Sequence, residues 1–348
     1  MRTNLRGMVL GFVLLVLCVL GPVGAAERGN LLVDVFRKLL LIQPDGVQRT
    51  LAEQVVFASL SPDGRYVAFT DLEQNLTVVN LSSGAKYTLV KLSAGAVLGE
   101  IGWAPDGTAV AYLGVGSGAR GGFFLVPFPS ERRPIRRLGP WEQYQGFSFS
   151  PDGSKIVHAV NVPSPGVEIL DLATGRPELV HKAAGKVWEA KFSPDGQFIA
   201  YRMTIAEPPR GSDDCVPPTI GLRLYSLRER SNIALPIRSA PRELNDIKSF
   251  DWSPDGKQIV VTLGEIFCDF PGGASSIFLT TLDLRSQTRI SASNLAIDPL
   301  FSPDGTAVAY VDYSDSPSRL FRYDLSTGTT VLIRRAEQDA FYRLTDWK

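Results

Sequence analysis

One short phrase, Pro-Asp-Gly preceded by serine or alanine, occurs six times in this chain. The copies begin at Ser61, Ala104, Ser150, Ser193, Ser253 and Ser302. The steps between successive copies are 43, 46, 43, 60 and 49 residues. A period in this range is typical of a propeller blade and not of a helical solenoid. The chain is therefore expected to stack similar units side by side.

Each repeat predicts four short antiparallel strands. A large apolar residue ends the first strand, and Pro-Asp-Gly then makes a turn, since proline sets φ and glycine tolerates a positive φ. In the next strand, two large residues share one face and a small residue lies between them, as at Val67, Ala68 and Phe69. A third strand ends in a second turn, such as residues 171–175, and a fourth strand follows. Four such strands make one blade, and blades must stack to bury their faces.

The two ends of the chain supply complementary parts of one further blade. Residues 38–46 match the third strand and second turn of a repeat, and residues 47–51 match the fourth strand. Residues 344–347 match a first strand, while residues 30–36 fit either a strand or a short helix. Closure of this kind removes the open sheet edges. The predicted fold is all-β, a β-propeller of four-stranded blades, with seven blades favoured and six as the alternative.

The repeat resembles a known family. An aromatic residue, Ser-Pro-Asp-Gly, then Ile or Val, Ala, and Tyr or Phe, followed by Asp-Leu-x-x-Gly, is similar to the TolB-type, WD-like propeller repeat. The resemblance covers about residues 37–348 and implies a periplasmic protein with a protein partner. The chain leaves no room for the additional amino-terminal α/β domain of TolB, so its specific pathway is not carried over.

Residues 1–25 are expected to be a secretory signal peptide, and residues 26–348 a single propeller domain. Arg2 and Arg6 precede an uncharged apolar run from Met8 to Leu20, and small residues follow at 23–26. The run is shorter than the roughly 20 residues of a membrane span. We expect a periplasmic or secreted protein with no membrane insertion after cleavage; an uncleaved anchor is the alternative.

The repeat phase places the Pro-Asp-Gly turns and the second turns on one face of the ring, here called the turn face. The longer connections, including residues 205–219 and 266–275, lie on the opposite face, here called the loop face. Cys215 and Cys268 occupy equivalent loops of adjacent blades. An exported protein can keep a disulfide, so we expect a bridge between them; two distant free thiols are the alternative.

Exposed aromatic and acidic side chains on the loop face are the candidate binding residues. They are Trp141, Tyr144, Trp188, Asp213, Asp214, Asp269 and Phe270. The alternative interpretation is that the tryptophans pack between blades and that the acids are solvated loop residues. His158 takes the place that tyrosine holds in other repeats and is expected in the core. His181 ends a fourth strand and faces either solvent or the next blade.

The sequence contains no motif of catalysis or cofactor binding. Gly-x-Ser-x-Gly, His-Glu-x-x-His and a glycine-rich phosphate loop are missing. The aspartates of the Pro-Asp-Gly turns are expected to serve their own turns and not to bind calcium. With 36 basic and 36 acidic residues, the chain lacks the basic field that nucleic acid requires. We expect no cofactor and no metal.

The favoured function is a non-catalytic binding or scaffold role for a monomer that presents its loop face and central funnel to a protein or peptide. The alternative is a hydrolase or lyase that acts through carboxylates at the funnel. Acids with perturbed pKa values converging on the channel mouth would favour the enzyme. A funnel lined by apolar and backbone groups would favour binding.

Overall fold

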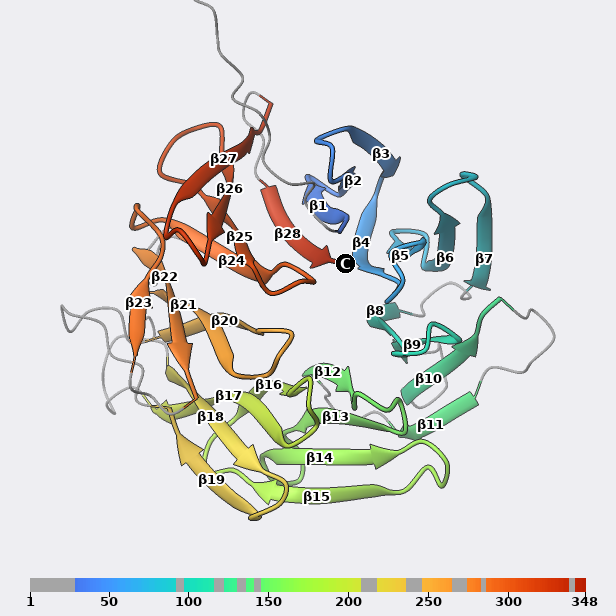
Figure 1. The fold of residues 1–348 in the computed structure, drawn as a ribbon. Coiled ribbons are helices and arrows are strands. Elements are labelled where there is room, and N and C mark those ends of the chain that lie inside the picture. Colours follow the sequence, from blue (N-terminus) through green and yellow to red (C-terminus); the bar gives the residue numbers. More distant parts are fainter. Residues whose placement is uncertain are drawn as a thin grey trace, which may run out of the picture.

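Seven four-stranded antiparallel sheets are arranged in a ring around a central axis in the computed structural model (Figure 1). The structure describes residues 29–91, 97–115, 122–129, 136–140, 145–207, 218–235, 246–264, 274–282, 286–337 and 342–348. These residues form 28 strands. None of the described residues is helical, and so none belongs to a helix that could cross a membrane. The seven-bladed prediction is confirmed, and the alternative of six blades is wrong.

The strands follow the blades in sequence order. The first sheet contains β28 (Tyr342–Trp347), β1 (Leu31–Val35), β2 (Lys38–Ile42) and β3 (Gln48–Ala52). The next three sheets contain β4 (Val55–Leu60), β5 (Tyr66–Asp71), β6 (Asn75–Asn80) and β7 (Lys86–Lys91); β8 (Val97–Trp103), β9 (Ala109–Val115), β10 (Gly122–Pro127) and β11 (Arg136–Pro140); and β12 (Gln145–Phe149), β13 (Lys155–Val160), β14 (Gly166–Asp171) and β15 (Pro177–Lys182). The last three contain β16 (Val187–Phe192), β17 (Phe198–Ala206), β18 (Thr219–Ser226) and β19 (Ser231–Ala234); β20 (Asp246–Trp252), β21 (Gln258–Gly264), β22 (Ser275–Thr281) and β23 (Gln287–Arg289); and β24 (Ala296–Phe301), β25 (Ala307–Asp312), β26 (Arg319–Asp324) and β27 (Thr330–Arg335).

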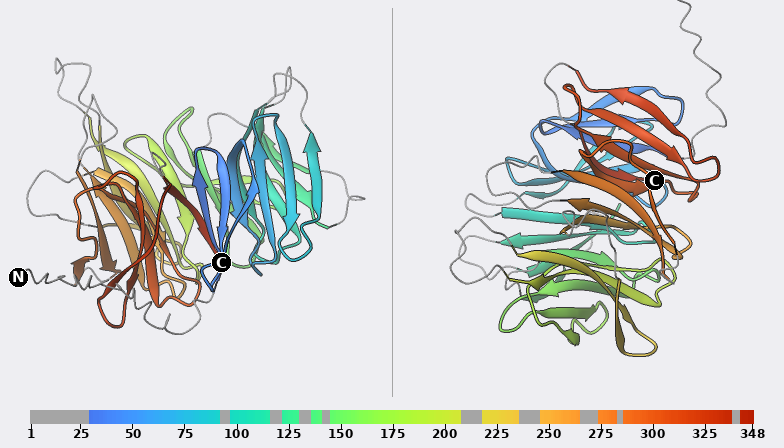
Figure 2. Two further views of the ribbon diagram at one scale, coloured as in Figure 1. Left: turned by 90° about the horizontal axis from the view of Figure 1, so that it is seen from above. Right: turned by 90° about the vertical axis from the view of Figure 1, so that its left-hand side faces the viewer.

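One strand of each sheet lies next to the central axis. These inner strands are β4, β8, β12, β16, β20, β24 and β28, and the other strands of each sheet follow outward (Figure 1). In the side views, the strands of neighbouring blades run side by side, and the connections between strands lie at the two faces of the ring (Figure 2). Because each inner strand ends at a Pro-Asp-Gly turn or at Trp347, its beginning lies at the loop face.

The Pro-Asp-Gly turns are held by their own side chains. At the first copy, the Ser61 hydroxyl donates to Asp63 Oδ1 over 2.6 Å, and the Arg65 amide donates to the same oxygen over 3.0 Å. Gly64 has a φ of 66°, which a glycine adopts without strain. The copies that begin at Ser150, Ser193, Ser253 and Ser302 repeat the serine-to-aspartate bond. These carboxylates therefore serve their turns, as predicted.

The hydrophobic core is divided into seven clusters, one in each gap between neighbouring sheets. Alternation along the second strand of a blade explains this division. Val67 and Phe69 contact the preceding blade, while Ala68 faces the following blade. The small residue is required because the first strand of the next blade places a bulky side chain in the same gap. Trp103, for example, lies in the gap that contains Ala68.

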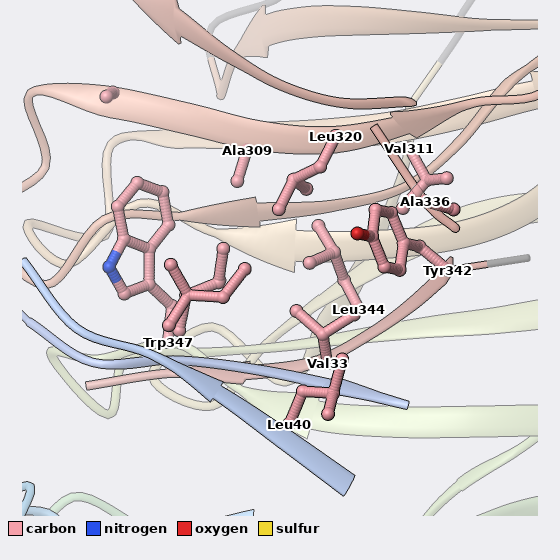
Figure 3. Packing of buried hydrophobic residues seen from close by; sticks show 12 residues of the cluster. Val33, Leu40, Ala309, Val311, Leu320, Ala336, Tyr342, Leu344 and Trp347 are labelled. Carbon is pink, nitrogen blue, oxygen red and sulfur yellow. The ribbon is translucent and has the colours of Figure 1, made fainter. Parts of the chain in front are cut away.

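The first blade closes the ring with strands from both ends of the described chain. β28 pairs with β1, with Tyr342 opposite Val35 and Trp347 opposite Leu31. Trp347, which is 5% exposed, then packs with Leu344 and Val33 against Ala309 and Leu320 of the preceding blade (Figure 3). The segment at residues 30–36, predicted as a strand or a helix, is thus a strand.

Hydrogen bonds from side chain to backbone tie neighbouring inner strands together. The residue directly before the motif aromatic supplies the acceptor, and the aromatic or apolar residue of the next blade supplies its amide. Ser148 accepts from the amide of Phe192, Asp251 from Phe301, and Asp346 from Leu60, over 2.8, 2.9 and 2.9 Å. Asp346 also accepts from the Ser59 hydroxyl over 3.1 Å. The closing strand therefore uses the same contact as the internal blade junctions.

Candidate functional site

Every inner strand carries a β-bulge that interrupts its pairing with the second strand of the blade. The register shift leaves the following residues without an opposite partner: Val56, Gly99 or Glu100, Gly146, Trp188, Lys248, Asp298 or Pro299, and Thr345. A bulge bends the strand locally and redirects a side chain. Here, five of these residues line one central cavity.

This cavity, here called the funnel, lies at the loop-face end of the inner strands and has a volume of about 420 Å³. Its wall consists of Asp34, Leu39, residues 55–59, Glu100, Ile101, Gly146, Trp188, Glu189, Arg202 and residues 343–345. The residues come from five of the seven blades and include both acids and bases. A volume of this size falls in the range of small-ligand pockets, about 300–1,000 Å³.

Glu189 is the centre of an ion-pair network in the funnel wall. Its Oε1 lies 2.9 Å from Lys191 Nζ, and its Oε2 lies 2.9 Å from Arg202 Nε. Burial alone would raise the pKa of Glu189, but the two cations outweigh it and hold the pKa below its ordinary value. Arg202 also donates to the carbonyls of Ile247 and Lys248 over 3.0 and 2.6 Å. The network therefore joins two blades and keeps Glu189 ionised.

Glu100 lies in the same wall but has a different environment. The backbone amide of Phe147 donates to its carboxylate, and no described residue forms an ion pair with it within 4.0 Å. Burial and the neighbouring Glu189 carboxylate raise the pKa of Glu100 to about 7, although Lys191 opposes the shift. Two neighbouring glutamates thus have pKa values displaced in opposite directions.

Gly146 lines the funnel together with Glu100 and Glu189, and the part of the wall that these three residues form is here called the recess. Strand β12, which carries Gly146, lies between β8 with Glu100 and β16 with Glu189. A Cβ atom at position 146 would lie only 3.1 Å from Glu189 Cγ, and the residue has a φ of 61°. Both the space and the backbone conformation therefore require glycine.

A second group of charged residues extends from the opposite wall of the funnel, where Asp34 and Arg343 are lining residues. Burial raises the pKa of Asp298 to about 6 and also raises the pKa of Asp34, while Arg343 opposes both shifts. Asp34 Oδ1 is buried and has no hydrogen-bond partner among the described residues. The Tyr313 hydroxyl donates to the carbonyl of Tyr342, and burial raises the pKa of Tyr313.

Acids with perturbed pKa values therefore converge on the channel mouth, which is the arrangement that the sequence analysis associated with an enzyme. Perturbed pKa values also arise in structural ion-pair networks, and the Glu189 network belongs to that class because it bridges two blades. The funnel also has an apolar side, built from Val55, Val56 and Phe57 of β4. The lining thus combines the charged groups expected of an enzyme with the apolar groups expected of a binding site.

Trp188 is the one sequence-predicted site residue within the described part of the chain, and it lines the funnel. Its indole Nε1 donates to Thr204 Oγ1 over 3.3 Å, and Lys186 Nζ lies 3.8 Å from the ring centroid. The other predicted residues lie outside the described residues. These are Trp141, Tyr144, Asp213, Asp214, Asp269 and Phe270 of the predicted surface, and Cys215 and Cys268 of the predicted disulfide.

Both histidines are structural. His158 is 1% exposed, its ring centroid lies 5.0 Å from that of Phe123, and its Nε2 lies 3.1 Å from Glu168 Oε1. His181 packs against Tyr201 and Tyr225 of the next blade. Of the two environments predicted for it, solvent or the next blade, the second is confirmed. Within the described residues, no three side chains of histidine, cysteine, aspartate or glutamate are placed to hold a metal ion.

The charged residues of the funnel were not predicted from the sequence, although their spacing carries a signal. Glu100 and Glu189 each precede the motif aromatic by three positions, and Lys191 and Asp251 precede it by one. Charged residues inside short strands that are otherwise apolar indicate a polar surface at the axis. The bulges obscure the signal, because they shift the alternation between the beginning and the end of each strand.

No protein-family model matches the chain, and no curated protein does. Solved structures do. TolB from Acinetobacter baumannii is 16% identical with a TM-score of 0.55, and the match covers 88% of this chain and 78% of that chain. An oligogalacturonate lyase in complex with manganese is 13% identical with a TM-score of 0.63, and 82% of each chain is covered.

A puromycin hydrolase is also similar, at 16% identity and a TM-score of 0.67. The match covers 90% of this chain but 55% of the hydrolase, so this chain spans about half the length of that enzyme. At such identities, the likeness concerns the fold alone, and that fold occurs in proteins with different functions. The chain thus has a seven-bladed β-propeller fold, and its fold is similar to those of TolB and of these two enzymes.

Proposed function

We propose that this chain is an exported, non-catalytic binding protein that receives a segment of a protein or peptide partner in its funnel. The observation that carries the proposal is the funnel itself: a cavity of about 420 Å³ at the axis, lined by residues that the bulges release from strand pairing. This volume suits one or two side chains of an extended segment and is too small for a folded domain. The partner would thus insert a short segment while its remainder covers the loop face.

The state of Glu189 supports binding over catalysis. A general base must take up a proton during the reaction. Both carboxylate oxygens of Glu189 are ion-paired with cations at 2.9 Å, and these cations lower its pKa and hence its affinity for a proton. Lys191 is engaged as well, because its Nζ donates to the carbonyl of Phe250 over 3.1 Å. These groups stabilise the junction between blades and offer little freedom for proton transfer.

The favoured location is the periplasm or the exterior of the cell. The support is the apolar run at residues 8–20, with arginines before it and small residues after it. The resemblance to TolB points the same way. The proposal concerns the mature chain from about residue 26.

A second candidate function is an acid–base enzyme of the hydrolase or lyase type. One observation favours it: Glu100, with a pKa raised to about 7, lies beside Glu189, whose pKa is lowered. Pairs of carboxylates with separated pKa values are typical of acid and base roles. In that case, Glu100 would donate a proton at neutral pH, and replacing it with glutamine would abolish turnover of a glycan or peptide substrate.

Site-specific photocrosslinking tests the binding proposal. A benzophenone amino acid would replace Val56 or Thr345 in the funnel, and Thr108 or Ser326 on the turn face as matched controls. Each variant would be irradiated in envelope extract of the source organism, and the adducts would be identified by mass spectrometry. We expect both funnel positions to capture the same peptide segment of one protein, and the turn-face positions to capture none.

Two outcomes would contradict the proposal. Adducts from the turn-face positions alone would move the binding surface to the other side of the ring. If no position captures a protein, and wild type cleaves envelope glycans or peptides while the Glu100→Gln variant does not, the enzyme is the correct function. New reducing ends or new amino groups would report that cleavage.

A further inference from the structure

We infer that the recess between Glu100 and Glu189 binds an organic cation, namely an ammonium or guanidinium group carried by the inserted segment. This inference rests on the proposed function and adds the chemistry of the ligand to it. Three features of the funnel carry the inference: the unequal pairing of its charges, the position of Glu100 in the cavity lining, and the ion pairs and hydrogen bonds that its basic groups already form.

The charges of the wall are unequally satisfied. Glu189 has two cationic partners at 2.9 Å, whereas Glu100 accepts from a backbone amide and forms no ion pair with a described residue. A largely buried carboxylate that forms no ion pair is costly, and a cation brought by a ligand relieves this cost. A ligand that brings a positive charge to Glu100 is therefore favoured over a neutral or negatively charged one.

The recess gives a cation access to this carboxylate, because Glu100 and Gly146 line the same cavity. A Cβ atom at position 146 would come within 3.1 Å of Glu189 Cγ, so any other residue would crowd Glu189 in the wall of the recess. The chain instead keeps a glycine in a left-handed conformation at the cavity wall. A strand position that combines a bulge, a positive φ and an open wall fits the close approach of a ligand.

The basic side chains of the same wall already form ion pairs and hydrogen bonds within the protein, which argues against an anionic ligand. Arg202 donates to Glu189 and to the carbonyls of Ile247 and Lys248. Lys191 contacts Glu189 and the carbonyl of Phe250. A divalent metal ion is disfavoured for a separate reason: it would lie beside these two cations. A single organic charge, which can share hydrogen bonds between Glu100 and the cavity rim, fits better.

Binding of a cation at Glu100 is expected to depend on pH. Of the described residues, those facing Glu100 are Glu189 and Lys191 from β16 and the Phe147 amide from β12, with Arg202 behind Glu189. Since the pKa of Glu100 is about 7, only about a tenth of the molecules are ionised there at pH 6. The affinity for a cation should thus fall about tenfold from pH 8 to pH 6.

Short peptides of defined charge test the inference. The probes are acetyl-Gly-Lys-Gly-amide, acetyl-Gly-Arg-Gly-amide, the same peptide with neutral norleucine, and Gly-Gly-Gly-amide with a free amino terminus. Dissociation constants would be measured by ligand-observed NMR at pH 8 and pH 6 with the mature chain. We expect at least one cationic probe to bind about tenfold more tightly than the norleucine peptide at pH 8, and the best probe identifies the source of the charge.

Three variants make the test specific. Glu100→Gln removes the charge at nearly constant shape and should bring the cationic and neutral probes within about twofold of each other. Gly146→Ala crowds Glu189 at the recess without changing any charge and should weaken the binding of the cationic probes; if it does not fold, Glu100→Gln decides alone. Asp106→Asn, on the turn face of the blade that carries Glu100, should retain the preference.

The inference fails if the Glu100→Gln variant keeps the preference for cations, or if wild type has none. In that case, protein segments can still crosslink to Val56 and Thr345, and the proposed function stands. If crosslinks to the funnel are also missing, the proposed function fails together with the inference. A preference that is lost in Asp106→Asn as well would reveal a general charge effect and would also overturn the assignment to the recess.

Discussion

Replacing Glu100 with glutamine is expected to stabilise the folded chain at alkaline pH. The folded protein keeps a proton on Glu100 up to about pH 7, whereas an unfolded chain releases it near the ordinary pKa of 4.5. The folded state therefore binds more protons between these values, and its stability falls as the pH rises through this interval. Glutamine has no charge to bury and can still accept from the Phe147 amide.

The size of the effect follows from the same two pKa values. Each pH unit in the interval contributes about 1.4 kcal/mol, so Glu100 costs the wild type at most about 3 kcal/mol above pH 7. Partial solvation of the funnel lowers this figure, and we expect the variant to gain about 1–3 kcal/mol at pH 8.5. At pH 4.5, both proteins are neutral at this position, and their stabilities should agree within about 0.5 kcal/mol.

Urea unfolding followed by tryptophan fluorescence measures this difference, once reversibility has been shown at each pH. The carboxyls of Asp34, Asp251 and Asp298 also have raised pKa values and affect both proteins alike, so the difference between variant and wild type isolates Glu100. If the variant is equally stable or less stable at pH 8.5, Glu100 is not the strained carboxylate that the funnel geometry implies.

Three further predictions concern ring closure and export. Asp346→Ala should lower the free energy of unfolding by about 2–3 kcal/mol, because it leaves a buried amide without its acceptor. Asp346→Asn should lower it by about 1 kcal/mol. Equal losses of the two variants in urea titrations would contradict the role of Asp346 in ring closure. Trp347→Ala should cost about 3–5 kcal/mol by thermal or urea unfolding, whereas Val331→Ala at a 56% exposed position should change little. Alkylation of exported protein without reductant should leave Cys215 and Cys268 unmodified, and labelling of both would disprove the bridge.

The sequence was sufficient for the architecture because the turns and the core follow local rules. A turn built on Asp63 and Gly64 is set by residues that are adjacent in the chain, and the alternation of Val67 and Ala68 divides the core between two gaps. The complementary ends were also predictable, since Trp347 has the place of the aromatic residue in each internal repeat.

The funnel was less predictable because its residues come together only through ring closure. Glu100, Glu189 and Arg343 are far apart in sequence, yet all three line one cavity. The bulges add a second difficulty: they shift the alternation along each inner strand, so periodicity alone does not show which of its residues face the axis. The sequence also does not reveal which glutamate forms ion pairs, because Glu100 and Glu189 occupy the same position of their repeats.

The looped-out residues also affect how such a protein can diverge. Thr345 and Val56 have no opposite partner in the ladder, and their neighbours in each strand maintain the packing between blades. A substitution at one of these positions would change the surface of the axis while the core and the turns stay intact. Positions such as Val56 and Thr345 are therefore nearly neutral for folding and can be selected for recognition, so ligand preference can evolve one position at a time.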